Sequence, residues 1–182
     1  MKVLIIYADG FEDVEALATR DVLVRAGFEV YDAKINDNEQ LVISSHKVAL
    51  SGFKSLKNIN IKEFDALIIP GGSRGVMNLL NSSDTIKAVK EAYDLNKFVC
   101  AICAGPMVLS KAGVLEGHTY TCYPGCEEDL LGTYTGKEVE VSGKIITARS
   151  MMYSIPFGLK IIELLASKEL SEKINRQISG LK

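Results

Sequence analysis

The sequence of 182 residues lacks an excess of basic side chains. Its 21 Lys and Arg residues are offset by 23 Asp and Glu residues, which leaves a formal net charge of -2 at pH 7. Proteins that bind nucleic acids or membrane surfaces present a strong positive field, and this composition does not supply one. We therefore expect small neutral or acidic molecules as partners, and neither nucleic acid nor membrane.

The chain also lacks a long apolar run, internal repeats, low-complexity tracts and linkers. The apolar segment within residues 1–7 is too short for a signal peptide or a membrane span, and acidic residues follow it. We interpret it as a first strand and expect a cytoplasmic protein whose four cysteines are reduced thiols. The length fits a single domain, residues 1–182, that needs no disulfide to fold.

Short apolar runs alternate with helical patterns along the chain. Buried strands are predicted at residues 3–8, 28–33, 66–69 and 98–102, and a further strand at 118–123. Helices are predicted at residues 13–26, 81–96, from Gly105 to a stop at Gly113, from Pro156 onward, and at 171–178. Hairpins are predicted within 42–50 and 139–148, whereas 56–63 is ambiguous. The alternation predicts an α/β fold in which helices cover both faces of a mostly parallel sheet.

The most informative stretch is residues 97–106, Lys-Phe-Val-Cys-Ala-Ile-Cys-Ala-Gly-Pro. Cys103 falls at the turn between a buried strand and a helix, which is the position of a nucleophile elbow. The small Ala104 and Gly105 allow a substrate to approach the backbone closely. Free N–H groups at the start of the helix are expected to lower the pKa of the Cys103 thiol. Cys100, inside the strand, fits an inert core residue instead.

Three turns are expected to meet at one edge of the sheet. They are Asp9-Gly10-Phe11-Glu12, Pro70-Gly71-Gly72-Ser73-Arg74 and Cys103-Ala104-Gly105. Each follows a predicted parallel strand, and ligands of open α/β sheets bind at the carboxyl ends of such strands. This edge is therefore the predicted site.

These turns resemble those of the ThiJ/PfpI superfamily, in its branch of parkinsonism-associated deglycases and glutathione-independent glyoxalases. Residues 101–106, Ala-Ile-Cys-Ala-Gly-Pro, are the most specific part of the resemblance, which covers nearly the whole chain. It implies a flavodoxin-like three-layer sandwich, usually a homodimer, that works without a cofactor or metal. Family members are described as glyoxalases that convert methylglyoxal to lactate, as deglycases of early glycation adducts, as redox-sensing chaperones, or as peptidases.

Carried over by position, the resemblance implies that Cys103 is the nucleophile and that Glu15 is the acidic residue hydrogen-bonded to it. By position alone, Glu15 also fits a first-turn acid that complements the helix dipole. Backbone N–H groups of Gly72 and Ala104 would hold an oxyanion. The complete set of implied oxyanion and substrate-binding residues is Gly71, Gly72, Ala104, Tyr123 and Arg149.

One departure from the family pattern concerns histidine. The family's histidine after the elbow falls at Tyr123, and the only downstream histidine, His118, lies about 17 Å away along an extended strand. His46 and His118 are both expected to face solvent. The peptidase branch keeps a histidine directly after its cysteine, where this chain has Ala104, so peptidase activity is the less favoured alternative.

A carboxyl group and a thiol in one pocket are expected to retain one proton between them, because two negative charges side by side are unfavourable. We predict that Glu15 keeps this proton while Cys103 is the thiolate. The neutral carboxyl group can then act as an acid or base toward the substrate.

The four cysteines allow other interpretations. Cys100, Cys103, Cys122 and Cys126 have spacings compatible with a zinc site, but Cys100 lies in an apolar strand rather than in a polar loop. A thioredoxin-type dithiol is disfavoured for the same reason. Cys122 and Cys126 lie near the predicted edge, either as bystanders or as a resolving thiol.

Two functions from different classes remain. The first is a cysteine-dependent, cofactor-independent glyoxalase or deglycase that acts on methylglyoxal, related reactive carbonyls or early glycation adducts. The second is a redox-sensing stress protein or chaperone in which Cys103 is oxidised to the sulfinate.

Overall fold

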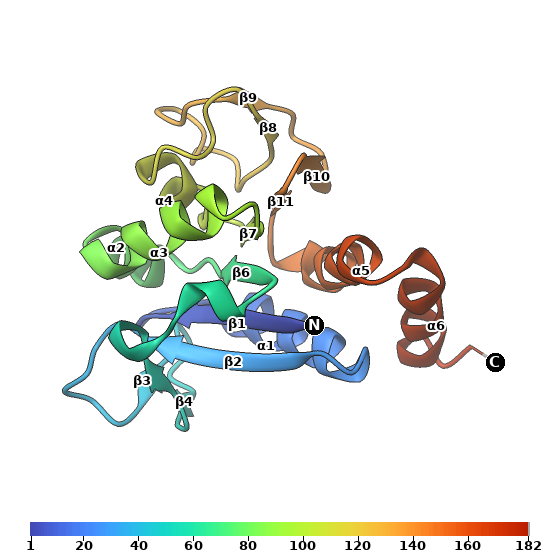
Figure 1. Cartoon of the computed structure of the whole chain (residues 1–182), viewed down its shortest axis with the longest axis horizontal. Helices are drawn as coiled ribbons and strands as arrows, with labels where there is room; N and C mark the ends of the chain where they lie inside the picture. The colour runs from blue at the N-terminus through green and yellow to red at the C-terminus, as the bar shows by residue number, and fades with distance from the viewer. Residues whose placement is uncertain (182) are drawn as a thin grey trace.

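The computed structural model describes residues 1–181 and has a seven-stranded sheet at its centre (Figure 1). The strand order is β10-β11-β7-β6-β1-β2-β5, and every pair is parallel except the antiparallel β10 and β11. These strands are β1 (Lys2–Tyr7), β2 (Glu29–Lys34), β5 (Lys54–Ser55), β6 (Ala66–Ile69), β7 (Phe98–Ile102), β10 (Val139–Ser142) and β11 (Ile145–Ala148). This confirms the predicted mostly parallel sheet.

Helices cover both faces of the sheet (Figure 1). One face packs against α2 (Ser73–Leu80), α3 (Ser83–Asp94) and α4 (Pro106–Lys111). The other packs against α1 (Asp13–Arg25) and α5 (Ser154–Leu165), and α6 (Lys168–Ile178) packs against α5. The three-layer α/β sandwich is therefore confirmed.

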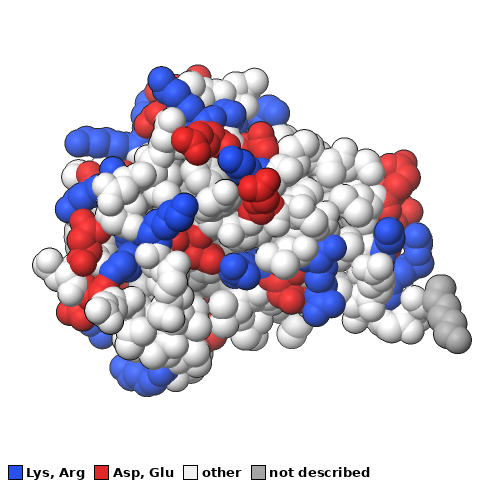
Figure 2. Space-filling view, turned by 60° about the horizontal axis from the view of Figure 1, so that its bottom comes forward, with Lys and Arg blue, Asp and Glu red and all other residues white. Residues whose placement is uncertain are grey.

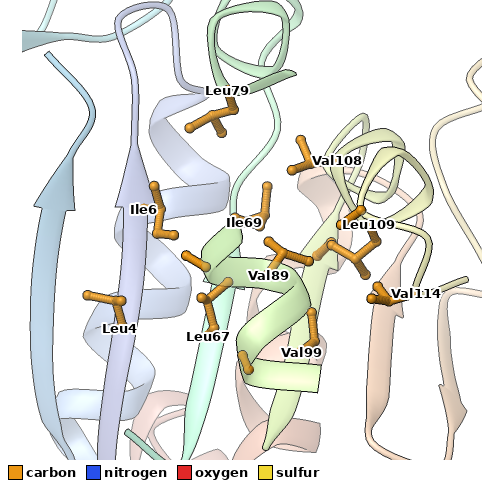
Figure 3. Close-up of a cluster of buried hydrophobic side chains, with 14 of the residues drawn as sticks. Leu4, Ile6, Leu67, Ile69, Leu79, Val89, Val99, Val108, Leu109 and Val114 are labelled. Carbon is orange, nitrogen blue, oxygen red and sulfur yellow. The ribbon is translucent and has the colours of Figure 1, made fainter. Parts of the chain in front are cut away.

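Alternating side chains of the central strands divide the core in two. Leu4 and Ile6 of β1 lie in the cluster with α2, α3 and α4 that Figure 3 shows, whereas Val3 and Ile5 belong to the cluster on the opposite face. The division follows from the two-residue period of a strand, because successive side chains point to opposite faces. A strand buried on both faces must be apolar, as β6, β7 and residues 3–7 of β1 are.

The predicted strand at 118–123 needs correction, and the helices predicted from Pro156 and at 171–178 begin earlier, at Ser154 and Lys168. Only β8 (Thr119–Tyr120) forms, and it pairs with β9 (Thr133–Tyr134) outside the main sheet. The ambiguous segment 56–63 contains two short 3₁₀ helices, Leu56–Asn58 and Ile61–Glu63. The hairpins are β3 (Val42–Ile43) with β4 (Ala49–Leu50), and β10 with β11, as predicted.

The sequence prediction missed α2, because it placed a turn at residues 70–74 and assigned no element between that turn and residue 81. The helix begins immediately after Gly72, and its buried residues Val76 and Leu79 face the core at a spacing of three. This apolar spacing was the signal available in the sequence. The omission matters because α2 forms one wall of the site.

Acidic and basic side chains are interspersed on the face shown in Figure 2. No helix within residues 1–181 is both long enough and apolar enough to cross a membrane. The cytoplasmic location stays a prediction.

Candidate active site

Cys103 occupies the sharp turn between β7 and α4. Its φ of 62° is in the left-handed region, which a residue other than glycine adopts only when its surroundings require it. The surroundings here are two backbone hydrogen bonds. The Cys103 N–H donates to the Ala148 carbonyl of β11 at 2.9 Å, and the Cys103 carbonyl accepts from the Tyr123 N–H at 2.9 Å. The elbow is therefore held from both sides, and its side chain is partly exposed.

The Cys103 side chain opens into a largely apolar cavity of about 590 Å³. Val76 and Met77 of α2 line it, together with Met107 of α4. The remaining lining residues are Glu12, Ser45, Gly72, Ser73, Ala104, Tyr123, Pro124, Gly125 and Cys126. A cavity of this size is in the usual range for small-molecule sites.

Glu15 lies in the first turn of α1 and is buried. The Gly71 N–H donates to Glu15 Oε2 at 2.9 Å, and the backbone places Glu15 beside the elbow. A Cβ atom added to Gly71 would lie 2.3 Å from Glu15 Oε2 and 2.8 Å from Cys103 Cβ, so both side chains border the same glycine. The structure thus brings the two predicted catalytic residues together.

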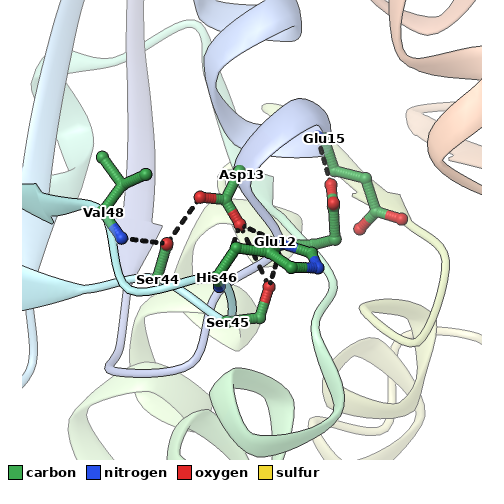
Figure 4. A network of polar contacts seen from close by, with 7 residues as sticks. All are labelled: Glu12, Asp13, Glu15, Ser44, Ser45, His46 and Val48. Carbon is green, nitrogen blue, oxygen red and sulfur yellow. Dashed lines mark hydrogen bonds and ion pairs between the residues drawn. The ribbon is translucent and has the colours of Figure 1, made fainter.

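The start of α1 is anchored through Glu12 and Asp13, which precede Glu15 (Figure 4). Glu12 Oε2 accepts the Glu15 N–H at 2.7 Å, which caps the helix. Asp13 accepts hydrogen bonds from the Ser44 and Ser45 hydroxyls and contacts His46 Nδ1 at 2.7 Å. Burial raises the pKa of Asp13, but the bonds from Ser44, His46 and Ser45 outweigh it and lower the pKa to about 2. Asp13 is therefore ionised at neutral pH and fixes the helix start that carries Glu15.

The pair of Glu15 and Cys103 has a perturbed titration. Burial raises the pKa of Glu15 to about 7, although hydrogen bonds with Cys103 and Gly71 oppose the shift. Burial, and then the charge of Glu15, raise the pKa of the Cys103 thiol well above its ordinary value. The pair therefore holds two protons below about pH 7 and one above it.

The sequence prediction of a lowered thiol pKa is wrong. Burial, and then the charge of Glu15, raise the pKa of Cys103, and most of the first amides of α4 are unavailable to oppose this shift. Gly105 N–H bonds to the Ile102 carbonyl, Pro106 has no N–H, and Met107 N–H bonds to the Ala104 carbonyl. Only the Ala104 N–H lowers the pKa of Cys103. Backbone N–H groups of Gly71 and Met151 lower the pKa of Glu15 and so oppose the expected retention of the shared proton by Glu15, which stays a prediction.

The predicted oxyanion residues divide into two groups. Gly72 and Ala104 line the cavity, and within residues 1–181 the Gly72 N–H has no hydrogen-bond acceptor. Gly71, in contrast, uses its N–H on Glu15 and its carbonyl on the Glu12 N–H at 3.0 Å. Gly71 therefore positions Glu15 rather than binding an oxyanion.

The two remaining predicted binding residues have different positions. Tyr123 lines the cavity with half of its surface exposed. Arg149 does not line it, because its guanidinium donates to the Gly136 carbonyl at 3.0 Å and to the Tyr153 hydroxyl. In this chain Arg149 supports the neighbouring loops.

The histidines lie outside the cavity. His46 is exposed, as predicted, but His118 is half-buried, with Nε2 2.9 Å from the Tyr93 hydroxyl and Nδ1 2.9 Å from the Ser142 hydroxyl. The prediction that His118 faces solvent is wrong. Both of its ring nitrogens have partners, and His118 does not replace the family histidine. Within the described residues, no three of the cysteines converge at metal-ligand distance.

Comparisons with known proteins show the family. The model of the DJ-1/PfpI family matches residues 1–164. The chain belongs to the DJ-1/PfpI family. Protein dj-1beta of Drosophila melanogaster is 34% identical over 174 residues, which is 94% of this chain and 92% of that protein. A deglycase of Pyrococcus horikoshii is 33% identical over 152 residues, covering 82% of this chain and 90% of that protein.

Solved structures of the DJ-1/PfpI family have the same fold. The oxidized form of Toxoplasma gondii DJ-1 superposes with a TM-score of 0.90 and 34% identity, over 97% of each chain. Drosophila melanogaster DJ-1beta superposes with a TM-score of 0.91 and 32% identity, over 100% of this chain and 98% of that chain. The family resemblance stated from the sequence is thereby confirmed.

Alkylation with iodoacetamide is expected to label Cys103 before Cys100, because Cys100 is completely buried. The rate at Cys103 should rise as the pH passes through about 7, where the pair loses its first proton and Glu15 can accept the thiol proton. Peptide mass spectrometry after timed alkylation of the native protein measures both rates. Equal labelling of Cys100 and Cys103 would contradict the elbow assignment.

Gly71→Ala is expected to abolish any activity that needs Glu15 and Cys103 together. The added methyl group would overlap Glu15 Oε2 and Cys103 Cβ, and it would lie 3.1 Å from the Ile102 carbonyl. Gly113→Ala is the control for backbone strain: the added atom meets open space there, but the φ of Gly113 is 72°, whereas the φ of Gly71 is not positive. Slow alkylation of Cys103 in Gly71→Ala, with normal alkylation in the control, is the expected result; equal rates would contradict it.

Proposed function

We propose that this protein is a cysteine-dependent enzyme that acts, without a cofactor, on methylglyoxal and related small reactive carbonyl compounds. The observation that carries the proposal is that Cys103, which lines an apolar cavity, is paired with the buried carboxyl group of Glu15. Membership of a family that contains proteins named deglycase supports a carbonyl substrate.

The first step is addition of Cys103 sulfur to the aldehyde carbon of methylglyoxal. Glu15, ionised above about pH 7, accepts the thiol proton as the carbon–sulfur bond forms. The aldehyde oxygen becomes an oxyanion beside the free N–H of Gly72 and the N–H of Ala104. Proton return to that oxygen gives a hemithioacetal.

The second step moves a proton between the two substrate carbons. Glu15 removes the proton from the carbon bonded to sulfur, an enediol forms, and Glu15 returns the proton to the adjacent carbon. The product of this transfer is a thioester of lactate on Cys103. Water then cleaves the thioester, which releases lactate and restores the thiol. Early glycation adducts carry a related carbonyl-derived carbon that the same sulfur could attack.

The cavity fits a small, weakly polar substrate. Val76, Met77, Met107 and Tyr123 provide apolar surface, and the charged lining residue is Glu12. Tyr123 occupies the position of the family histidine, so proton transfer in this chain depends on Glu15. The predicted homodimer forms part of the proposal and stays a prediction.

A redox role for Cys103 is the second candidate. Cys103 is partly exposed, whereas Cys100 in the strand before the elbow is buried. A relative of known structure is described as oxidized. Oxidation of Cys103 by a peroxide would block carbonyl addition. The two roles are therefore competing uses of one sulfur.

A steady-state assay with methylglyoxal and no glutathione tests the proposed enzyme. Lactate should form with the wild-type protein, and Cys103→Ser should form none above background, because a hydroxyl is a far weaker nucleophile than a thiol at neutral pH. Cys100→Ser serves as the matched cysteine control. Lactate formation by Cys103→Ser at the wild-type rate would refute the proposal.

A further inference from the structure

Two of the four cysteines share the active-site cavity. Cys100 and Cys122 are completely buried, whereas Cys103 and Cys126 are partly exposed and both line the same cavity. Carbonyl chemistry uses only Cys103. Cys126 is therefore an accessible thiol for which the proposed reaction has no role.

Backbone hydrogen bonds hold Cys126 close to the elbow. The Tyr123 N–H donates to the Cys103 carbonyl at 2.9 Å, and the Cys126 N–H donates to the Tyr123 carbonyl at 2.9 Å. One tight turn thus separates Cys126 from Tyr123, whose N–H bonds to the Cys103 carbonyl. In agreement with this proximity, a charge on Cys126 contributes to raising the pKa of the Cys103 thiol.

The turn that carries Cys126 has room to adjust. Tyr123, Pro124 and Gly125 are all exposed, and the surroundings of the Gly125 Cα are open. Gly125 has a φ of 93°, a conformation that glycine leaves and enters at little cost. A disulfide needs its two Cα atoms about 4.4–6.8 Å apart, and an adjustment confined to this exposed turn would leave the sheet undisturbed.

We propose that Cys126 is the resolving thiol for an oxidised Cys103, so that the cavity reduces hydroperoxides reversibly. In the first step, Cys103 sulfur attacks a hydroperoxide, which leaves as an alcohol or water, and Cys103 becomes a sulfenic acid. In the second, Cys126 sulfur attacks the sulfenic sulfur; its proton joins the departing hydroxide as water, and a Cys103–Cys126 disulfide forms. A dithiol then reduces the disulfide and is itself oxidised to a cyclic disulfide.

The other two cysteines are unsuitable partners. Cys100 lies in the middle of the sheet, with its side chain in the apolar cluster beneath α1 and α5. Cys122 is enclosed in the opposite cluster. Burial, then the neighbouring Cys126 and Glu127, raise the pKa of Cys122 to about 12, so it is both inaccessible and protonated.

This inference rests on Cys103 as the nucleophile of the proposed function but not on its carbonyl chemistry. The test treats the reduced full-length protein with one equivalent of hydrogen peroxide and follows the intact mass. We expect the mass to fall by that of one hydrogen molecule, and a non-reducing peptide map to join Cys103 to Cys126. Dithiothreitol should restore the original mass.

Cys126→Ser provides the decisive comparison. Without a resolving thiol, Cys103 should gain first one and then two oxygen atoms, and the second gain should resist dithiothreitol. Cys122→Ala is the control and should still form the disulfide; the peptide map of the wild type gives the answer independently of whether this control folds.

A wild-type protein that only gains oxygen, or a map that joins Cys103 to Cys100 or Cys122, would overturn the inference. Methylglyoxal turnover is measured on the same reduced protein. If the disulfide does not form but methylglyoxal is still converted, only the resolving role of Cys126 is rejected. If neither reaction occurs, Cys103 is rejected as the nucleophile.

Discussion

Glu15→Gln is expected to lower kcat for methylglyoxal conversion by about two orders of magnitude or more, the usual contribution of general acid-base catalysis. The amide keeps the size of the side chain and can accept the Gly71 N–H, so the local structure should persist. It cannot accept and return a proton. Proton transfer between the substrate carbons therefore fails even where sulfur addition still occurs.

Two comparisons make this expectation specific. Glu15→Asp retains the carboxyl group but shortens its reach, so its kcat should lie between those of the wild type and Glu15→Gln. In the wild type, kcat/KM should rise with pH through about 7, because the free enzyme must lose the first proton of the pair. Glu15→Gln with wild-type turnover, alongside an inactive Cys103→Ala, would mean that Glu15 only complements the dipole of α1.

The same Glu15→Gln variant is expected to be more stable than the wild type at pH 8. Burial raises the pKa of Glu15 from its ordinary value of 4.5 to about 7 in the folded protein. The unfolded chain therefore releases this proton first, and wild-type stability falls as the pH rises from about 4.5 to about 7. The full difference, on the order of 3 kcal/mol, applies above pH 7.

Thermal unfolding at several pH values measures this effect. The melting temperature of Glu15→Gln should exceed that of the wild type by several degrees at pH 8, and the two should converge near pH 4. Glu91→Gln on the exposed side of α3 is the matched control and should show no such pH dependence. A constant difference at all pH values would contradict the raised pKa. Lower activity with higher stability would show that the protein retains a costly buried acid for function.

Much of the architecture could be predicted because it depends on local patterns. The apolar runs of β1, β6 and β7 are continuous, as strands buried on both faces require. Acidic residues at the start of α1 and Arg25 at its end marked that helix. The end of β8 and the existence of α2 were harder, because both segments are short and depend on neighbouring elements for their packing.

The prediction of the elbow succeeded for a similar reason. Cys103 lies between a strand and a proline-initiated helix, and small residues follow it, so the chain must turn sharply there. The position of Glu15 beside it required long-range information, since 88 positions separate two side chains that meet only because β1, β6 and β7 are neighbours. The family resemblance supplied that information. In the structure, the Gly71 N–H donates to Glu15 and holds it beside the elbow.

By itself, the sequence determined the layered α/β architecture, the elbow at Cys103 and the edge of the sheet where its turns converge. Only the tertiary structure decided which groups each side chain meets. It removed Arg149 from the cavity, assigned Gly71 to Glu15, and brought Cys126 to the cavity of Cys103. It also reversed the expected shift of the thiol pKa, because burial and a buried carboxyl group outweigh a single amide. Titration depends on desolvation and on charges distant in sequence, and neither is encoded in a local pattern.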